Sequence, residues 1–377
     1  MKKIRNTIGK KLLVCDLKRE YSVVRAEVGR AARRVLESGW YILGKEVEAF
    51  EEEFSRYVGS SNAIGVASGT EALQLALAAL SISRGDEVIT AVNTAIPTAV
   101  AIRAAGARPV FIDADERTSN IDVRMIKKAI TRKTKAIIPV HLYGNPCDMK
   151  EVSNIAERYG LAVVEDCAQS HGARYRGRHT GTFGDLGAFS FYPTKNLGCY
   201  GDGGMVVTDD KKLAGRLRLL RNYGQSSRYR CDAEGINSRL DEVQAAILRE
   251  KLKLLDYFVG RRIAIAGLYR KLLKNISDVA TFEKAGEAKH AFHLYVIKAK
   301  DREGLKSYLE RSGIETQMHY PIPLHMQKAF RDLGYKKGDF PVAEKLAGEI
   351  MSLPIFPAMK DSEVRAVCRR IKEFYRG

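Results

Sequence analysis

The 377-residue sequence is informative first through what it lacks. No stretch of about 18 uninterrupted apolar residues occurs, and Met1-Lys2-Lys3-Ile4-Arg5 is not followed by the apolar core of a signal peptide. The six cysteines are scattered without a CxxC pair, which argues against a zinc knuckle and against a disulfide framework. We therefore expect a cytoplasmic protein with no membrane association, reduced thiols and no metal site.

Acidic residues are the minority among the charged side chains, with 45 Asp and Glu against 63 Lys and Arg and a formal net charge of +18. Such an excess can indicate nucleic-acid binding. Here, however, basic and acidic residues are interleaved, as in Lys45, Glu46 to Glu53 and Arg56, and they form no basic stripe. An anionic small substrate explains the charge as well as nucleic acid does, and a cationic surface is the favoured cause, so we predict no nucleic-acid partner.

Hydrophobic periodicity predicts the secondary structure. Apolar positions spaced by three and four indicate amphipathic helices over 21–37 and 46–58, ended by Ser38-Gly39 and by Gly59. Short apolar runs then alternate with helical patterns: strands at 63–66, 88–90, 109–112, 136–140, 161–165, 186–191 and 205–208, and helices at 71–80, 98–105, 123–130, 149–159, 209–223 and 239–272. This alternation is typical of an α/β domain with parallel strands and crossover helices.

The pattern changes beyond Val279. A strand over 292–299 is followed by predicted helices over 301–312, 342–350 and 361–375. We divide the chain into a basic N-terminal segment (1–16), a large α/β domain (17–255) and a smaller C-terminal α+β domain (256–377).

Three short segments suggest a single site at the carboxyl ends of strands, where α/β proteins bind ligands. Ala67-Ser68-Gly69-Thr70 follows a strand and opens a helix, so it can seat a phosphate, although taken alone the segment favours an ordinary helix cap. Asp166 ends an apolar strand and needs a cationic partner, which a salt bridge or a protonated pyridine nitrogen would supply. Lys195 precedes a glycine-rich turn; a desolvated lysine there can attack a carbonyl to form an imine. Together they meet the requirements for binding pyridoxal phosphate.

Five stretches, in this order, resemble the DegT/DnrJ/EryC1/StrS family of sugar aminotransferases over nearly the whole chain: Leu36 to Gly44 (LESGWYILG), Ser68 to Leu73 (SGTEAL), Glu165 to Gly172 (EDCAQSHG), Phe189 to Gly198 (FSFYPTKNLG) and Gly235 to Leu240 (GINSRL). The resemblance implies the aspartate-aminotransferase-like fold type I. That fold has a mostly parallel, mixed seven-stranded sheet flanked by helices and a smaller C-terminal domain.

The resemblance also implies roles for particular residues. Lys195 would form the Schiff base with pyridoxal 5'-phosphate, Asp166 would pair with the pyridine nitrogen, and Gln169 would hydrogen-bond the ring hydroxyl. Three further residues would hold the cofactor phosphate: Gly69, Thr70 and Ser190. Asn237 would reach the cofactor phosphate of the neighbouring subunit, which implies a homodimer with shared active sites; from its position alone, Asn237 could instead cap the helix that follows.

In this family glutamate donates the amino group, leaving pyridoxamine phosphate, and a nucleotide-linked keto sugar accepts it. The segment Tyr320-Pro-Ile-Pro-Leu-His325 resembles that of relatives which aminate carbon 3, so Tyr320 and His325 are candidate substrate contacts, with Tyr41 a further one. A proline-stiffened loop with a surface histidine is the alternative for this segment. Amination at carbon 4, amination of a cyclitol ketone and a regulatory, non-catalytic relative also stay open.

One position departs from the family pattern. Many relatives carry an aromatic residue that stacks on the cofactor ring where this chain has Ala95. Another residue or an aliphatic contact must then cover that face of the ring.

Overall fold

The computed structural model describes residues 11–376. The first ten residues of the predicted basic segment 1–16 therefore lie outside the described residues. Within residues 11–376, no helix is long and apolar enough to cross a membrane. All six cysteines are free; Cys15 is half-buried and Cys231 is exposed, whereas the other four are buried.

A seven-stranded sheet forms the centre of the molecule, in the order β1-β9-β8-β5-β4-β2-β3. Only β9 runs against its neighbours, since it pairs antiparallel with both β1 and β8 while the remaining pairs are parallel. The strands are β1 (Asn62–Val66), β2 (Glu87–Ala91), β3 (Arg108–Ile112), β4 (Thr134–Ile138), β5 (Ala162–Asp166), β8 (Leu186–Ser190) and β9 (Gly204–Thr208). The mostly parallel, mixed seven-stranded sheet that the resemblance implied is confirmed.

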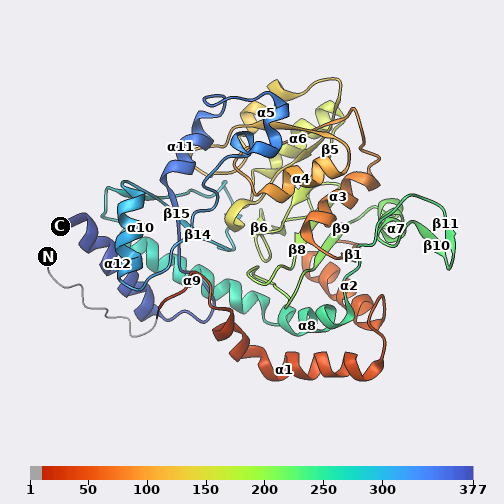
Figure 1. Ribbon diagram of the computed structural model, residues 1–377, viewed down its shortest axis with the longest axis horizontal. Coiled ribbons are helices and arrows are strands. Elements are labelled where there is room, and N and C mark those ends of the chain that lie inside the picture. The colour runs from red at the N-terminus through yellow and green to blue at the C-terminus, as the bar shows by residue number, and fades with distance from the viewer. Residues whose placement is uncertain (1–10, 377) are drawn as a thin grey trace.

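Helices cover both faces of this sheet (Figure 1). They are α2 (Lys45–Val58), α3 (Gly69–Ala79), α4 (Ile96–Ala104), α5 (Val123–Ala129), α6 (Met149–Tyr159), α7 (Lys211–Leu220) and α8 (Glu242–Leu252). Alternate strand residues enter different cores: Val206 packs with the α3 side, whereas Met205 and Val207 pack with Phe50 and Phe54 of α2. Because both faces are buried, the strands read as continuous apolar runs rather than alternating ones.

The first helix, α1 (Leu17–Ser38), lies outside this layered body and packs along α8 (Figure 1). It ends where the sequence predicted, because Gly39 adopts a left-handed conformation (φ 68°) that favours glycine. A hairpin of β10 (Gln225–Ser227) and β11 (Arg230–Cys231) projects beside α7, at the right of Figure 1.

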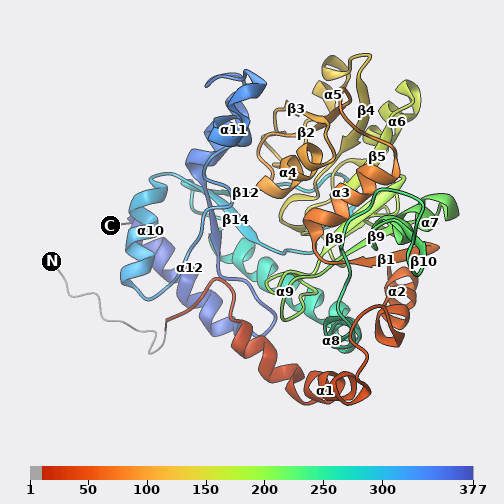
Figure 2. The same ribbon diagram turned by 45° about the vertical axis from the view of Figure 1, so that its right-hand side comes forward.

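The C-terminal lobe holds an antiparallel sheet, β12-β14-β15, and lies to one side of the central sheet in both views (Figures 1 and 2). Its elements are β12 (Val279–Thr281), β14 (Tyr295–Ala299), α10 (Arg302–Arg311), α11 (Pro341–Glu349), β15 (Ile350–Leu353) and α12 (Asp361–Arg376). Three short strands, β6 (Arg174–Tyr175), β7 (Arg178–His179) and β13 (Ala288–Lys289), form a small separate sheet.

Helix α9 (Leu255–Leu273) links the two lobes: Val259 packs into the core of the central sheet, whereas Ile265 and Tyr269 pack into that of the C-terminal lobe. The domain boundary predicted at residue 255 falls at the start of this helix and stays a prediction.

The single helix predicted over 239–272 is wrong. The chain forms α8 and α9 with a break at Lys253 and Leu254, where Leu254 keeps a right-handed conformation (φ −105°, ψ −1°) but its N–H donates to Lys251 O, three residues back instead of four. No glycine or proline marks this break. The strand predicted from residue 292 begins only at Tyr295, because Phe292 has a positive φ of 48°. Strand β15 is not predicted by the sequence pattern, and the helix predicted over 342–350 overlaps only its first residue, Ile350.

Candidate active site

One cavity of about 370 Å³ brings together most of the predicted site residues. It lies at the carboxyl ends of the parallel strands, as open α/β sheets favour. Its lining includes Gly69, Thr70, Asp166, Gln169, Ser190, Lys195 and Tyr320. Tyr320 comes from the C-terminal lobe and the others from the central-sheet lobe, so the cavity lies where the lobes meet.

Lys195 and Asp166 line this cavity, and the charge of each shifts the pKa of the other. Burial lowers the pKa of Lys195 to about 8, and the carboxylate of Asp166 opposes that shift. Burial likewise raises the pKa of Asp166, which is 5% exposed. The carboxylate accepts hydrogen bonds from Thr98 Oγ1 (2.8 Å) and the Ala168 N–H (3.1 Å). Both donors are neutral and, within residues 11–376, no ion pair to Asp166 forms, so the carboxylate is suited to pair with a cationic ligand.

The first turn of α3 supplies an anion seat. Ser68 caps the helix by accepting from the Glu71 N–H (3.2 Å), and the N–H groups of Gly69 and Thr70 belong to the turn that lacks intrahelical acceptors. A Cβ at position 69 would lie 2.5 Å from Ser190 Cβ, so only glycine lets this turn approach β8 so closely. The helix-cap reading and the phosphate-seat reading of this segment are therefore compatible.

Gln169 is fixed at both ends of its amide. Its Oε1 accepts from the Tyr143 N–H (2.6 Å), and its Nε2 donates to the Tyr320 hydroxyl (2.9 Å). This orientation turns the NH₂ group toward the cavity, where its second proton can reach a ligand hydroxyl. Burial raises the pKa of Tyr320 to about 12, so its hydroxyl stays protonated.

Three predicted site residues do not line the cavity. His325 is 3% exposed, bonds Glu344 Oε1 through Nε2 (3.0 Å) and packs on Phe340. It is therefore neither a cavity contact nor a surface histidine, because its ring is buried inside the C-terminal lobe and bonds Glu344 there. Tyr41 and Asn237 are exposed. Asn237 does not cap α8, whose N-cap is Asp241.

Ala95 lines the cavity, next to Ile96 and Pro97. The wall at the expected stacking position is thus aliphatic. Such a wall can cover an aromatic ring by apolar contact without the orientation that ring stacking imposes.

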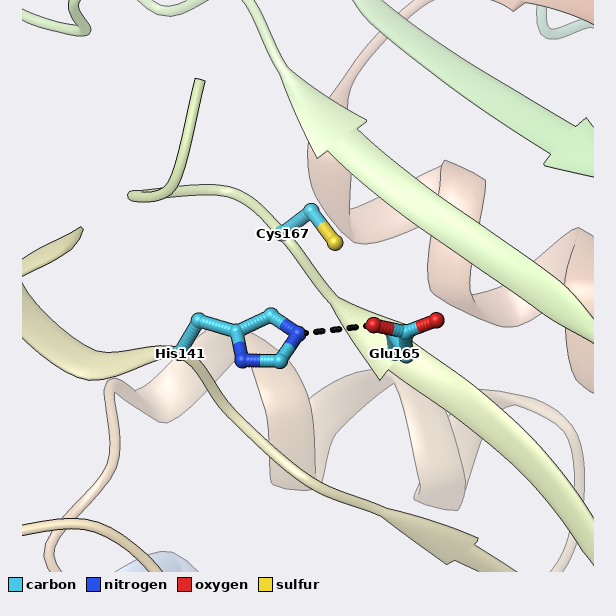
Figure 3. A group of neighbouring side chains, drawn as sticks. All are labelled: His141, Glu165 and Cys167. Carbon is cyan, nitrogen blue, oxygen red and sulfur yellow. Dashed lines mark hydrogen bonds and ion pairs between the residues drawn. The ribbon is translucent and has the colours of Figure 1, made fainter. Parts of the chain in front are cut away.

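A buried cluster lies beneath the end of β5 (Figure 3), where His141 Nε2 is 2.9 Å from Glu165 Oε2. His141 Nδ1 accepts from the Cys147 N–H (3.0 Å), which places the imidazole proton on Nε2. Glu165 also accepts from three backbone N–H groups, those of Gly181, Phe183 and Gly184. Burial raises the pKa of the neighbouring Cys167 thiol. The His141 ring nitrogens and the Glu165 oxygens are thus committed to hydrogen bonds, which anchor the strand that carries Asp166.

The fold and this cavity define an aminotransferase of fold type I. The profile of the DegT/DnrJ/EryC1/StrS aminotransferase family matches residues 23–372, and the chain belongs to this family. The chain is 46% identical over 359 residues to a Streptomyces venezuelae protein named dTDP-3-amino-3,4,6-trideoxy-alpha-D-glucose transaminase, covering 95% of both.

Two further similarities are informative. The chain is 44% identical over 363 residues to a Geobacillus stearothermophilus protein named a pleiotropic regulatory protein, covering 96% of this chain and 98% of that one. The crystal structure of S. venezuelae DesV in complex with a ketimine intermediate superposes with a TM-score of 0.96 at 44% identity, covering 98% of this chain and 100% of that one.

Proposed function

We propose that the protein is a pyridoxal-phosphate-dependent aminotransferase that moves an amino group from glutamate to carbon 3 of a nucleotide-diphosphate-linked keto sugar, in amino-sugar biosynthesis. The observation that carries this proposal is the shared cavity of Lys195, Asp166 and the first turn of α3. The name of the S. venezuelae relative, a 3-amino sugar transaminase, supports the choice of carbon 3.

The residues of the cavity fit the cofactor. Asp166 would hold the ring nitrogen protonated, Gln169 Nε2 would donate to the ring hydroxyl, and the turn at Gly69 and Thr70 with Ser190 would hold the phosphate. When bound, pyridoxal phosphate supplies the electron sink that stabilises negative charge at the substrate carbon. Lys195, with its pKa lowered to about 8, can both give and take a proton at Nζ near neutral pH.

A homodimer with shared sites belongs to this proposal. Asn237 is exposed and outside the cavity of its own chain, which suits a residue that acts on a neighbouring subunit. The last turn of α1 and the segment between α1 and α2 expose apolar side chains that a second copy would cover: Leu36, Trp40, Tyr41 and Ile42. A role for Tyr41 at the substrate would likewise require that copy. The cytoplasmic location remains a prediction.

The deciding experiment mixes purified protein, pyridoxal phosphate and glutamate with a panel of nucleotide-linked 3-keto and 4-keto sugars and a cyclitol ketone. We expect 2-oxoglutarate release with a 3-keto sugar and its loss in the Lys195→Ala variant. Release with a 4-keto sugar or the cyclitol alone would favour the alternative acceptors.

The name of the G. stearothermophilus relative favours a second candidate, a regulatory protein that binds without turnover. Retention of Lys195 and Asp166 in one cavity speaks for catalysis. Cofactor binding without turnover on any member of the panel would favour regulation.

A further inference from the structure

Two threonines, Thr98 and Thr94, form a chain of hydrogen bonds that ends at the carboxylate of Asp166. Thr98 Oγ1 lies 2.8 Å from Asp166 Oδ2, and Thr94 Oγ1 lies 3.2 Å from Thr98 Oγ1. Both side chains are buried, at 0% and 3% exposure, and both residues line the cavity. The other carboxylate oxygen is held by the Ala168 backbone N–H, so Thr98 is the only side chain bonded to this carboxylate within residues 11–376.

The chain of hydroxyls has a direction that depends on the charge of Asp166. A hydroxyl has one proton to donate, and an ionised carboxylate only accepts. With Asp166 ionised, Thr98 must donate to Oδ2, and Thr94 must then donate to Thr98. Each hydroxyl in such a chain polarises the next, which strengthens the bond to the charged end.

Helix capping does not explain these threonines. They flank the N-cap of α4, Ala95, where a threonine side chain ordinarily bonds a free N–H of the first turn. No side-chain cap bond forms there, and the Thr98 N–H bonds Ala95 O instead (3.3 Å). Both hydroxyls are therefore directed away from the helix and toward Asp166.

We propose that Thr98, supported by Thr94, is a positioning residue that keeps Asp166 ionised and oriented toward the pyridine nitrogen of the cofactor. The inference rests on the proposed function, because it concerns the same cofactor. Without a donor at Oδ2, the buried carboxylate would keep one backbone N–H bond and would favour its protonated form, which cannot pair with a pyridinium.

Other groups also act on this carboxylate. Burial raises its pKa, whereas Ala168, Thr98, Lys195 and His141 lower it. Among the other ionisable groups coupled to Asp166 are Tyr320 and two buried thiols, and the pKa of each is raised: Tyr320, Cys147 and Cys167. Glu165, the preceding residue, is committed to the His141 cluster. None of these groups changes in a threonine variant.

The test measures the affinity of cofactor-free protein for pyridoxal phosphate by absorbance titration between pH 5 and 9. Thr98→Val keeps the volume and β-branching but removes the donor, whereas Thr98→Ser keeps the donor. We expect Thr98→Val to weaken binding about tenfold or more, the value of one hydrogen bond to a charged group. The acid limb of its affinity profile should move to higher pH, since the proton then competes better for Asp166.

The serine variant should stay within a few-fold of wild type, and Thr94→Val should shift the acid limb in the same direction by less. A uniform loss of affinity across the pH range would show that Thr98 only packs, and would overturn the proposal. Equal losses in the serine and valine variants would overturn it too. If Thr98→Val does not fold, an unshifted limb in Thr94→Val is the overturning result. Wild-type protein that fails to bind pyridoxal phosphate refutes the proposed function instead.

Discussion

Replacing Asp166 with asparagine should make the cofactor-free protein more stable and should weaken its binding of the cofactor. The carboxylate is 5% exposed, and burial raises its pKa despite the two hydrogen bonds and Lys195. A raised pKa means that Asp166 stabilises the fold when protonated, below the unfolded value of about 3.9, and that this contribution is lost as pH rises through the folded pKa. At neutral pH the charge therefore costs stability, and asparagine removes the cost.

Asparagine can keep both existing contacts. Its Oδ1 can accept from the Ala168 N–H as Asp166 Oδ1 does, and its NH₂ can donate to Thr98 Oγ1 because that hydroxyl can turn its proton toward Thr94. The pairing with the pyridinium is lost. A hydrogen bond to a charged partner contributes about 1.5–3 kcal/mol, so cofactor affinity should fall roughly 10- to 150-fold.

Two measurements check whether stability rises while cofactor affinity falls. Thermal unfolding of cofactor-free protein at pH 7.5 should show a higher Tm for Asp166→Asn than for wild type, and the difference should shrink toward pH 4. Absorbance titration with pyridoxal phosphate should show the weaker binding. A variant that melts below wild type at pH 7.5, or that binds the cofactor as tightly as wild type does, would refute the reasoning.

Three further changes follow from the same geometry. Gly69→Ala should destabilise the fold by about 1–3 kcal/mol and weaken cofactor binding, because its Cβ would lie 2.5 Å from Ser190 Cβ; Gly215→Ala, with nothing within 4 Å of its Cβ, is the matched control and should melt at or above wild type. His325→Ala should lower stability by about 1–3 kcal/mol, because it removes a buried ring and its bond to Glu344, whose Oε1 keeps the Gly338 N–H, yet leave cofactor affinity unchanged; weaker cofactor binding would place His325 at the site. Mixing unfolded Lys195→Ala and Asn237→Ala chains and refolding them together should restore transfer that neither variant shows alone, since a mixed dimer holds one intact site; no recovery despite dimer formation contradicts sharing.

The layered fold could be predicted because local patterns and packing agree. Strands such as β1 and β5 lie between two helical layers, so each is a short apolar run, and glycines at 39 and 59 end α1 and α2 with left-handed residues that the sequence displays directly. The break between α8 and α9 could not be predicted, because no glycine or proline lies at Lys253 or Leu254 and Leu254 keeps a right-handed conformation. The apolar residues on both sides of the break, Leu248 and Leu252 before it and Leu255 and Val259 after it, pack in the same cluster, so the apolar pattern runs on across it.

The site residues also differ in whether their surroundings could be predicted from the sequence. Lys195, Asp166 and Gly69 line the cavity. They lie in a loop after a strand, at a strand end and in the first turn of a helix, so their surroundings could be predicted from the local order of the chain. Thr98 acts through a contact with Asp166, which is 68 residues away, and at a helix start it looks like an ordinary cap. His325 is the reverse case: its motif predicts a place near the substrate, whereas in the structure its ring bonds Glu344 and packs on Phe340. A role that depends on a contact between a hydroxyl and a distant carboxylate can be inferred only from the three-dimensional structure. The Thr98 variants test such a role, for which the sequence alone offers no indication.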